Sequence, residues 1–128
     1  MAEGKSPQQA IFDAIYSVCL KINERTYDYL PDAKTEYPFI YVGEVFNIDI
    51  KRYKLRRSGD VSITVHVYGG RHDRLKVTQT LEFIEADVKA LEAPVKTATY
   101  NDSSTQVLNQ KVEAETLIHG IIEINMSY

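Results

Sequence analysis

Three histidines, His66, His72 and His119, are the side chains best suited to acid–base or metal chemistry. A metal site built on one helix or strand needs a second ligand close along the chain, and no histidine has another histidine or the cysteine three or four residues away. The strand pattern places His66 on a polar face and His119 in the middle of another strand, with His72 at the entrance to a helix. We therefore expect structural or surface histidines and no metal site.

Cys19 is the single cysteine of the chain, so an internal disulfide and a cysteine-paired zinc site are both excluded. A nucleophilic cysteine needs a neighbouring base and an oxyanion site, and the sequence offers no candidate for either. Cys19 falls within a helical pattern close to apolar positions. This placement predicts a small buried hydrophobic residue.

The sequence contains no clear motif for a phosphate-binding loop or for a pair of catalytic carboxylates. Gly69-Gly70 lacks both the GxxxxGK[ST] and the GxGxxG spacing, and a turn from strand to helix explains it. The acidic side chains of the second predicted helix are separated and line its exposed side, which is typical of solvation: Glu82, Glu85 and Asp87. We expect no catalytic residue and no cofactor site, and hence no enzyme.

A basic cluster is the one feature that stands out. It consists of Lys51, Arg52, Lys54, Arg56 and Arg57. In an extended segment these side chains alternate between two sides, so they form no flat basic face, and only Tyr53 could stack on a base. Three interpretations remain open: a solvated hairpin tip, a contact to an acidic protein partner, or weak contact with phosphates.

The composition favours an ordinary globular protein. The 128 residues are 44% hydrophobic and 26% charged, with 15 basic and 18 acidic side chains and a net charge of -3. A protein that coats nucleic acid is normally basic. No apolar run approaches the length that a membrane span requires, and MAEGKSPQQ does not read as a signal peptide. We expect one domain over residues 1–128, made in the cytoplasm and without membrane contact.

Two amphipathic helices are predicted. The first spans 7–24, with Ser6 as cap, Pro7 in the first turn and Gln9 at capping-box spacing. The second spans 73–92 and ends before Pro94. Their apolar stripes are Ile11, Ala14, Ile15, Val18 and Ile22 in the first and Val77, Leu81, Ile84, Val88 and Leu91 in the second.

The first helix carries more apolar surface than one contact with a sheet requires. The additional face contains Phe12, Tyr16 and Leu20, beside Cys19. Two explanations remain open, because either loops of the same chain or a second subunit could cover it.

The apolar pattern on both sides of the basic cluster predicts two strands joined by a connector, which together form a long hairpin. The first, 39–50, places on one side Ile40, Val42, Phe46, Ile48 and Ile50. The basic cluster ends it, and Ser58-Gly59-Asp60 is expected to turn the chain. In the next strand every second residue is apolar, and this side is expected to be buried: Val61, Ile63, Val65 and Val67.

Weaker strands are predicted near 95–100 and 105–112, separated by Asn101-Asp102-Ser103-Ser104, and a stronger one at 117–127. In the last strand one side is formed by Ile118, Ile122, Ile124 and Met126. The order α-β-β-α-β-β indicates the α+β class, with an antiparallel-dominated sheet of four to five strands packed with two helices.

The whole pattern resembles the tail-completion, or tail-to-head joining, proteins of long-tailed bacteriophages. The matching pieces, in order, are the capped first helix, YPFIYVGEV, the basic connector, SGD with VSITVHVYGG, the helix RLKVTQTLEFIEADVKAL and HGIIEINMSY. The similarity covers nearly the whole chain, and the order and spacing of the pieces carry it.

The resemblance implies a structural virion protein that forms a ring, commonly a hexamer, at the head-proximal end of a phage tail. Such a ring joins the tail tube to the head connector and lets DNA pass with at most transient contact. A ring needs a heterologous interface, for which we expect the Phe12, Tyr16 and Leu20 face and the outer strand edges. The basic cluster would face the lumen or an adjoining ring. The alternatives are another neck or head-closure component, or a small nucleic-acid-binding module.

Overall fold

The computed structural model describes residues 6–53, 56–91 and 98–128, and for residues 49–53 and 56–57 it describes the backbone alone. Its elements are α1 (Pro7–Ile22), β1 (Thr26–Tyr27), β2 (Phe39–Tyr53), β3 (Arg56–Gly70), α2 (Arg74–Lys89), β4 (Thr99–Val112) and β5 (Glu115–Ser127). The five strands form one sheet in the order β1-β2-β3-β5-β4. Only the β1–β2 pair is parallel.

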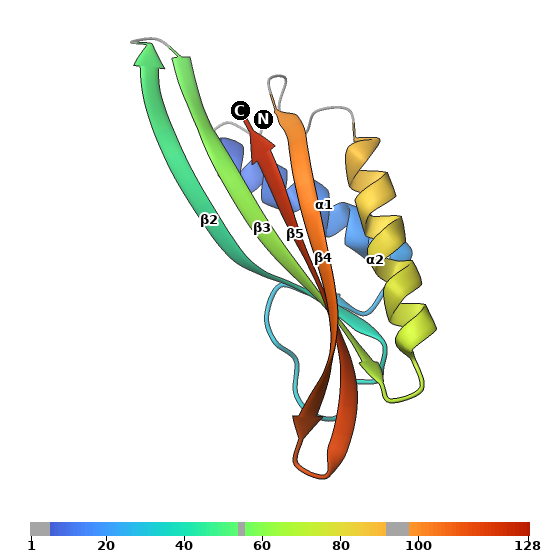
Figure 1. Ribbon diagram of the computed structural model, residues 1–128. Coiled ribbons are helices and arrows are strands. Elements are labelled where there is room, and N and C mark those ends of the chain that lie inside the picture. The colour runs from blue at the N-terminus through green and yellow to red at the C-terminus, as the bar shows by residue number, and fades with distance from the viewer. Residues whose placement is uncertain (1–5, 54–55, 92–97) are drawn as a thin grey trace.

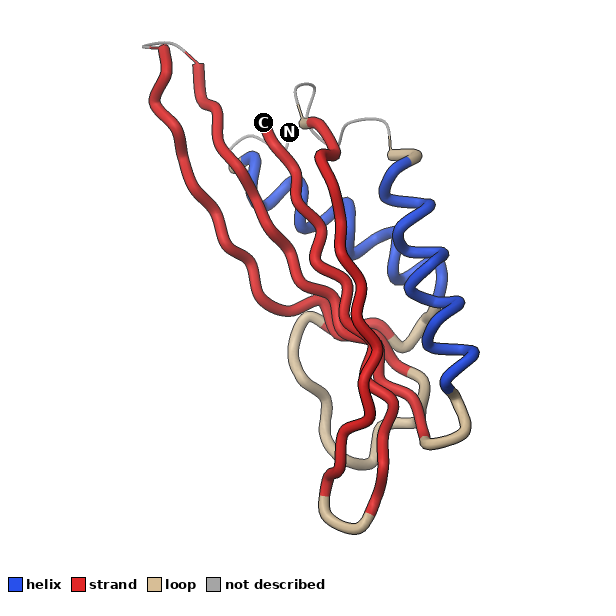
Figure 2. Tube along the Cα trace, viewed as in Figure 1, coloured by secondary structure: helices blue, strands red, loops and turns tan. Residues whose placement is uncertain are grey.

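Both helices cover the same face of this sheet, and they leave the opposite face open (Figure 1 and Figure 2). The α+β class, the two helices and the predominance of antiparallel pairing are confirmed. The expected element order was incomplete, because it lacked the two-residue strand β1 that makes the sheet mixed.

Helix α1 begins as its sequence predicts, since the Ser6 hydroxyl accepts a hydrogen bond from the Gln9 backbone N–H at 3.1 Å. Pro7 occupies the first turn. The predicted capping box is wrong in one respect: the side chain of Gln9 donates to Asp13 Oδ1 at 2.8 Å instead of reaching back to the cap. The helix ends at Ile22, before the predicted residue 24.

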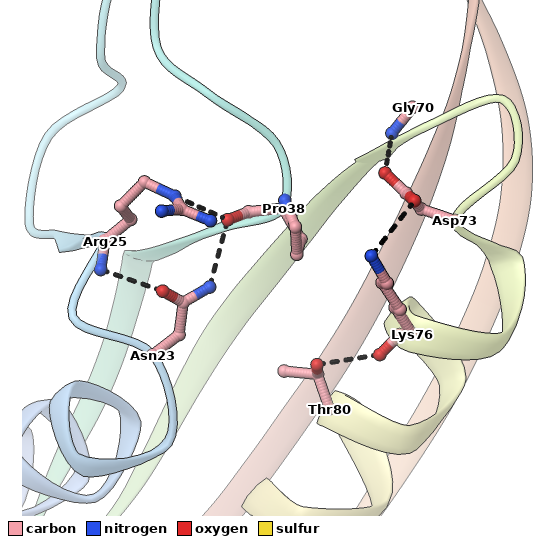
Figure 3. A network of polar contacts seen from close by, with 7 residues as sticks. All are labelled: Asn23, Arg25, Pro38, Gly70, Asp73, Lys76 and Thr80. Carbon is pink, nitrogen blue, oxygen red and sulfur yellow. Dashed lines mark hydrogen bonds and ion pairs between the residues drawn. The ribbon is translucent and has the colours of Figure 1, made fainter.

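The segment after α1 is tied to the start of β2 by a small polar network (Figure 3). The carbonyl oxygen of Pro38 accepts hydrogen bonds from Asn23 Nδ2 at 3.0 Å and from Arg25 Nε at 3.1 Å. The Arg25 backbone N–H donates to Asn23 Oδ1 at 2.9 Å. These bonds bring together the two ends of the connector over residues 28–38, which contains Tyr29 and Tyr37, and place β1 beside β2.

The hydrophobic core lies between the helices and the sheet. The predicted helical stripes supply much of it, and Ile11, Ile15, Val77 and Ile84 are fully buried. The sheet contributes the predicted inward sets of β3 and β5, namely Val61, Ile63, Val65, Val67, Ile118, Ile122, Ile124 and Met126. Each such side chain stabilises the fold by about 1.5–3 kcal/mol relative to an exposed one.

Strand β2 changes sides at a β-bulge. Val42 is opposite Val65, but Val45 is opposite Ile63, so β2 has one extra residue between these pairs. Val42 is fully buried, whereas Phe46, four residues on, is 64% exposed. The expectation that Ile40, Val42, Phe46, Ile48 and Ile50 share one side is therefore wrong from Phe46 onward, and the side chain of Ile50 lies outside the described part.

The hairpin of β2 and β3 is longer than expected. Ser58-Gly59-Asp60 does not turn the chain, because Ser58 pairs with Ile50 and Gly59 with Asp49 inside the ladder. Ladder pairing of β3 with β5 stops at Asp60, so the strands continue beyond it mainly as a two-stranded ribbon. We call residues 49–53 and 56–58 the β2–β3 arm; it projects past the ends of β4 and β5 (Figure 1).

Residues 101–104, which were expected to separate two strands, lie within the continuous strand β4. Their short polar side chains are satisfied by neighbours: Asn125 Nδ2 donates to Asp102 Oδ1 at 2.6 Å, and the Ser103 hydroxyl donates to Glu85 Oε2 at 2.6 Å. These bonds hold in an extended ladder a sequence that by itself favours a turn. Residues 95–97 of the expected strand lie outside the described residues.

Helix α2 follows the turn at the end of β3 and is shorter at both ends than the predicted 73–92. Asp73 precedes it and accepts a hydrogen bond from the Gly70 backbone N–H at 2.8 Å (Figure 3). Lys76 Nζ lies 4.0 Å from Asp73 Oδ1. Gly69 and Gly70 are thus the closing residues of β3, in agreement with the strand-to-helix explanation.

Candidate functional site

The open face of the sheet carries a cluster of ionisable side chains from three strands. Strand pairing places His66 of β3 opposite Tyr41 of β2 and Ile121 of β5, while His119 of β5 is opposite Tyr68 of β3. The two histidines are therefore diagonal neighbours on the face away from the helices. Glu44, in the bulge of β2, reaches the same place.

Hydrogen bonds join these three residues in a row. His66 Nδ1 lies 2.8 Å from His119 Nε2, and His66 Nε2 lies 2.9 Å from Glu44 Oε1 and 3.1 Å from Glu44 Oε2. His66 is the central member, because each of its ring nitrogens contacts a different partner. We call Glu44, His66 and His119 the histidine relay.

Aromatic rings enclose the relay on its open side. The ring of Tyr68 lies on that of His119 with centroids 4.3 Å apart and 13° between the planes. Phe39 stacks on Tyr68 at 5.1 Å, and Tyr41 lies beside His66 at 5.5 Å. This row of rings compensates for the missing helix layer, since only 8% of His119 is exposed.

Burial changes the proton affinity of the enclosed groups. The pKa of His119 is lowered, first because burial removes the charged form from water and next because His66 is close, while the Glu44 carboxylate acts in the opposite direction. The pKa of the Tyr68 hydroxyl is raised, mainly by burial and then by the charge of Glu44. The site therefore favours neutral His119 and neutral Tyr68.

The three histidines lie in two different environments. His72 is exposed before α2 and accepts a hydrogen bond from Arg71 Nε at 3.1 Å. His66 and His119 are instead brought together with Glu44. The alternation of β3 and β5 places both on the polar face, but a sequence without the strand register does not bring them into contact. Across residues 6–53, 56–91 and 98–128, no group of three or more metal-binding side chains has a geometry suited to a metal ion.

The basic cluster is not a loop between two strands. The backbones of Lys51 and Arg52 belong to β2, and those of Arg56 and Arg57 belong to β3, with Tyr53 opposite Arg56. Their side chains, and Lys54 altogether, lie outside the described part of the chain. The basic cluster was expected in a connector between the strands. Its described backbone instead belongs to the paired ends of β2 and β3.

The second apolar face of α1 is largely covered by the chain itself. Phe12 and Tyr16 pack against the core and stack on one another with centroids 6.3 Å apart. The Tyr16 hydroxyl donates to the Thr26 carbonyl oxygen at 3.0 Å. Leu20 remains 45% exposed. The same helix buries Cys19 completely, as expected, and this burial raises the pKa of its thiol to about 12.

Other apolar side chains are exposed on both sides of the molecule. Phe46 and Ile48 lie on the open sheet face beyond the bulge, at 64% and 46% exposure. On α2, Leu75 and Phe83 are exposed outside the packed stripe. Sequence alternation missed the first pair because the bulge reverses the sides of β2. None of the described helices is long and apolar enough to cross a membrane.

Comparison with known proteins gives a structural match alone. The sequence matches no protein-family model and none of the curated proteins. The fold is similar to that of a chain in the solved structure "Virion of native gene transfer agent (GTA) particle", with a TM-score of 0.53. The match covers 91% of this chain and 94% of that chain at 12% sequence identity. At this identity the match establishes a shared fold, that of an α+β chain found in a virion particle.

Proposed function

We propose that this protein is a structural component of a phage-like virion and catalyses no reaction. The similarity to a chain of the gene transfer agent particle carries the proposal, because it spans nearly the full length of both chains. A match of that extent concerns the whole fold and not one common motif. We further propose that the protein is made in the bacterial cytoplasm and functions in the assembled particle.

The more specific proposal is a ring at the head-proximal end of the tail, which joins the tail tube to the head connector and surrounds the passing DNA. The resemblance of the sequence to tail-completion proteins supports this role, and a hexamer is the copy number that it suggests. Closure of a ring requires two different patches that meet between neighbours. The exposed part of α1 around Leu20, with Phe12 and Tyr16 beneath it, is one candidate patch.

The outer strands are candidates for the opposing patch. Strand β4 pairs on one side only, with β5, and β2 extends well beyond its short partner β1. Unpaired strand edges are templates for pairing with another chain. In this proposal the edges are covered by neighbouring subunits in the ring.

The β2–β3 arm is the proposed contact to the lumen or to an adjoining ring. The arm is the end of β2 and β3, strands of 15 residues that are each about 50 Å long at about 3.3 Å per residue, so the basic residues lie at the far end of a long hairpin. Without the five basic residues the remaining chain has 10 basic and 18 acidic side chains, a net charge of -8. A basic arm on an acidic body suits an acidic partner surface and, at most, transient contact with DNA.

Particle assembly tests the proposal. Serine in place of Lys51, Arg52, Lys54, Arg56 and Arg57 should leave the fold intact and reduce the yield of joined, infectious particles. The matched control removes five charges from the body, at Lys21, Lys34, Arg74, Lys76 and Lys111. Electron microscopy of both lysates should show separate heads and tails for the arm variant alone. A normal yield of infectious particles from the arm variant would show that the arm has no part in joining heads to tails.

The nucleic-acid-binding alternative makes a different prediction. Binding through the basic cluster would weaken steeply as salt rises, because each phosphate contact releases counterions. A titration with short duplex DNA at several salt concentrations measures this directly. A strong salt-dependent affinity that the arm variant loses would favour a nucleic-acid-binding module, whereas negligible affinity favours the virion component. The alternative of another neck or head-closure component is tested by labelling the protein and locating the label in electron micrographs of the particle.

A further inference from the structure

The histidine relay has a fixed set of donors and acceptors. An ionised carboxylate only accepts hydrogen bonds, so Glu44 requires a proton on His66 Nε2. In neutral His66 the other nitrogen, Nδ1, is then an acceptor. His119 must therefore donate from Nε2 across the 2.8 Å contact. Neutral pH thus selects one tautomer for each ring.

One additional proton can enter without loss of either contact. His66 then carries protons on both nitrogens and donates to Glu44 and to His119. The proton on His119 Nε2 is replaced by one on Nδ1, so that His119 changes from donor to acceptor and stays neutral. Burial beneath Tyr68 favours this neutral form.

A second additional proton cannot be accommodated. With both rings fully protonated, two N–H groups face each other over 2.8 Å and neither can accept. Two positive charges would also face each other beneath the row of aromatic rings. The contact between the rings of His66 and His119 must then open, while His66 can still donate to Glu44.

The relay includes the bulge of β2, which precedes the segment that leads to the β2–β3 arm. Glu44 belongs to the bulge between Val42 and Val45, and its side chain fastens this bulge to β3. The residues that continue toward the arm follow directly after it. Because His66 can donate to Glu44 in each of these protonation states, this attachment persists, and the added protons act on the contact between His66 and His119.

We propose that Glu44, His66 and His119 form a proton-operated latch, in which the contact between His66 and His119 joins β3 to β5 on the open sheet face with zero or one added proton and opens with two. This inference concerns the isolated fold and does not depend on a role in virions. The ionisable groups of the neighbouring elements are Tyr41 of β2, Tyr68 of β3, Glu123 of β5 and Tyr37 of the connector. The residues of β4 opposite this region, Gln106 and Leu108, carry no charge.

Nitrogen NMR of the full chain with labelled histidines tests the latch. The sequence has only three histidines, and exposed His72 serves as an internal reference. Spectra are recorded from about pH 8 to about pH 5, the range in which histidine changes charge. We expect a through-hydrogen-bond coupling between His66 Nδ1 and His119 Nε2, with His119 changing tautomer when the pair takes up its first added proton.

Two variants separate the latch from a structural contact. Glu44→Gln removes the charge that opposes the lowered pKa of His119, so proton uptake by the pair should move to lower pH. Glu123→Gln removes a charge from the same sheet face, where Glu123 is opposite Thr64, and should leave the uptake unchanged. Glu44 is largely exposed, so its variant keeps the fold even if His119→Gln does not.

The pairing of β3 with β5 between the two histidines provides the second readout. As His119 becomes charged, the backbone amide signals of Val67 and Gly120, which are opposite each other in this pairing, should shift together and hydrogen exchange there should accelerate beyond its intrinsic pH dependence. In His119→Gln or Glu44→Gln this step should be absent or displaced. The latch is refuted if His119 becomes charged together with His72, or if no coupling between the rings occurs at any pH. It is also refuted if Val67 and Gly120 do not respond.

Discussion

Gly120 of β5 lies directly beneath Val77 of α2. A Cβ atom at position 120 would be 2.6 Å from Val77 Cγ1 and 2.9 Å from Leu81 Cδ1, closer than carbon atoms can approach. The absence of a side chain at this position lets α2 pack closely on the sheet, where its buried stripe meets β3 and β5. The glycine is therefore required by packing.

Gly120→Ala should destabilise the protein by about 1–3 kcal/mol, the usual cost of overpacking a core. Urea unfolding followed by circular dichroism measures the free energy of unfolding. Val77→Ala removes the atom that a new Cβ would meet, so the double variant should lose less than the two single variants together. Strict additivity would show that helix and strand are not in contact here.

The turn between β4 and β5 carries the second prediction. Glu113 has φ 57°, in the left-handed region that glycine adopts without steric cost. Glu113→Gly should therefore stabilise the hairpin by up to about 1 kcal/mol. Ala114→Gly should destabilise it by about 0.4–1 kcal/mol, because glycine raises the conformational entropy of the unfolded chain. Thermal unfolding of the two variants compares them directly. Destabilisation by both would mean that the strain at Glu113 is compensated locally.

Acid should weaken the fold through His119. Its pKa is lowered in the folded state, so the unfolded chain, in which the pKa is near 6.5, binds the proton first as the pH falls. Stability is therefore complete above about pH 7.5 and declines below pH 6.5, until the pH reaches the lowered pKa, with a slope of at most about 1.4 kcal/mol per pH unit.

Urea unfolding at a series of pH values measures this decline. In His119→Gln the slope between about pH 6.5 and pH 5 should be smaller, because the group that titrates differently is gone. His72→Gln is the control, since His72 is exposed and outside the relay. Equal slopes in the parent protein and in His119→Gln would contradict the assignment.

Cys19 should be inert in the folded protein. It is fully buried, and with its pKa raised from 9.0 to about 12 the thiolate fraction at neutral pH falls about a thousandfold. A chromogenic disulfide reagent should therefore react only at the rate at which the fold opens, and quickly in urea. As the chain has one cysteine, the signal reports a single site. Rapid reaction without denaturant would contradict the burial of this side of α1.

Periodicity predicted the elements with a single buried side. Most residues of the α1 and α2 stripes and the whole inward set of β3 lie in the core, because one buried face produces a regular pattern. Irregular places were missed for physical reasons. Asp102 and Ser103 favour turns locally, but contacts with Asn125 and Glu85 hold them in a strand.

The candidate site was the least predictable part. Its members come from three strands, and alternation gives the face of each side chain without giving its neighbours. Only the register, in which Tyr68 is opposite His119, brings the second histidine beside His66. Glu44 enters the group because the bulge allows its carboxylate to reach across, and alternation alone does not locate a bulge.

Two isoleucines of β2 test the bulge itself. Ile40 and Ile48 have the same parity along the strand, so an uninterrupted strand would bury both on one face. In the structure Ile40 is fully buried and Ile48 is 46% exposed. Ile40→Ala should therefore cost about 2–5 kcal/mol, as for other buried isoleucines, whereas Ile48→Ala should cost less than about 1 kcal/mol. The free energy of unfolding of both variants, measured in urea under one set of conditions, decides the matter. Equal large losses would mean that β2 runs without the bulge, and Phe46 and Ile48 would then belong to the core instead of the open face.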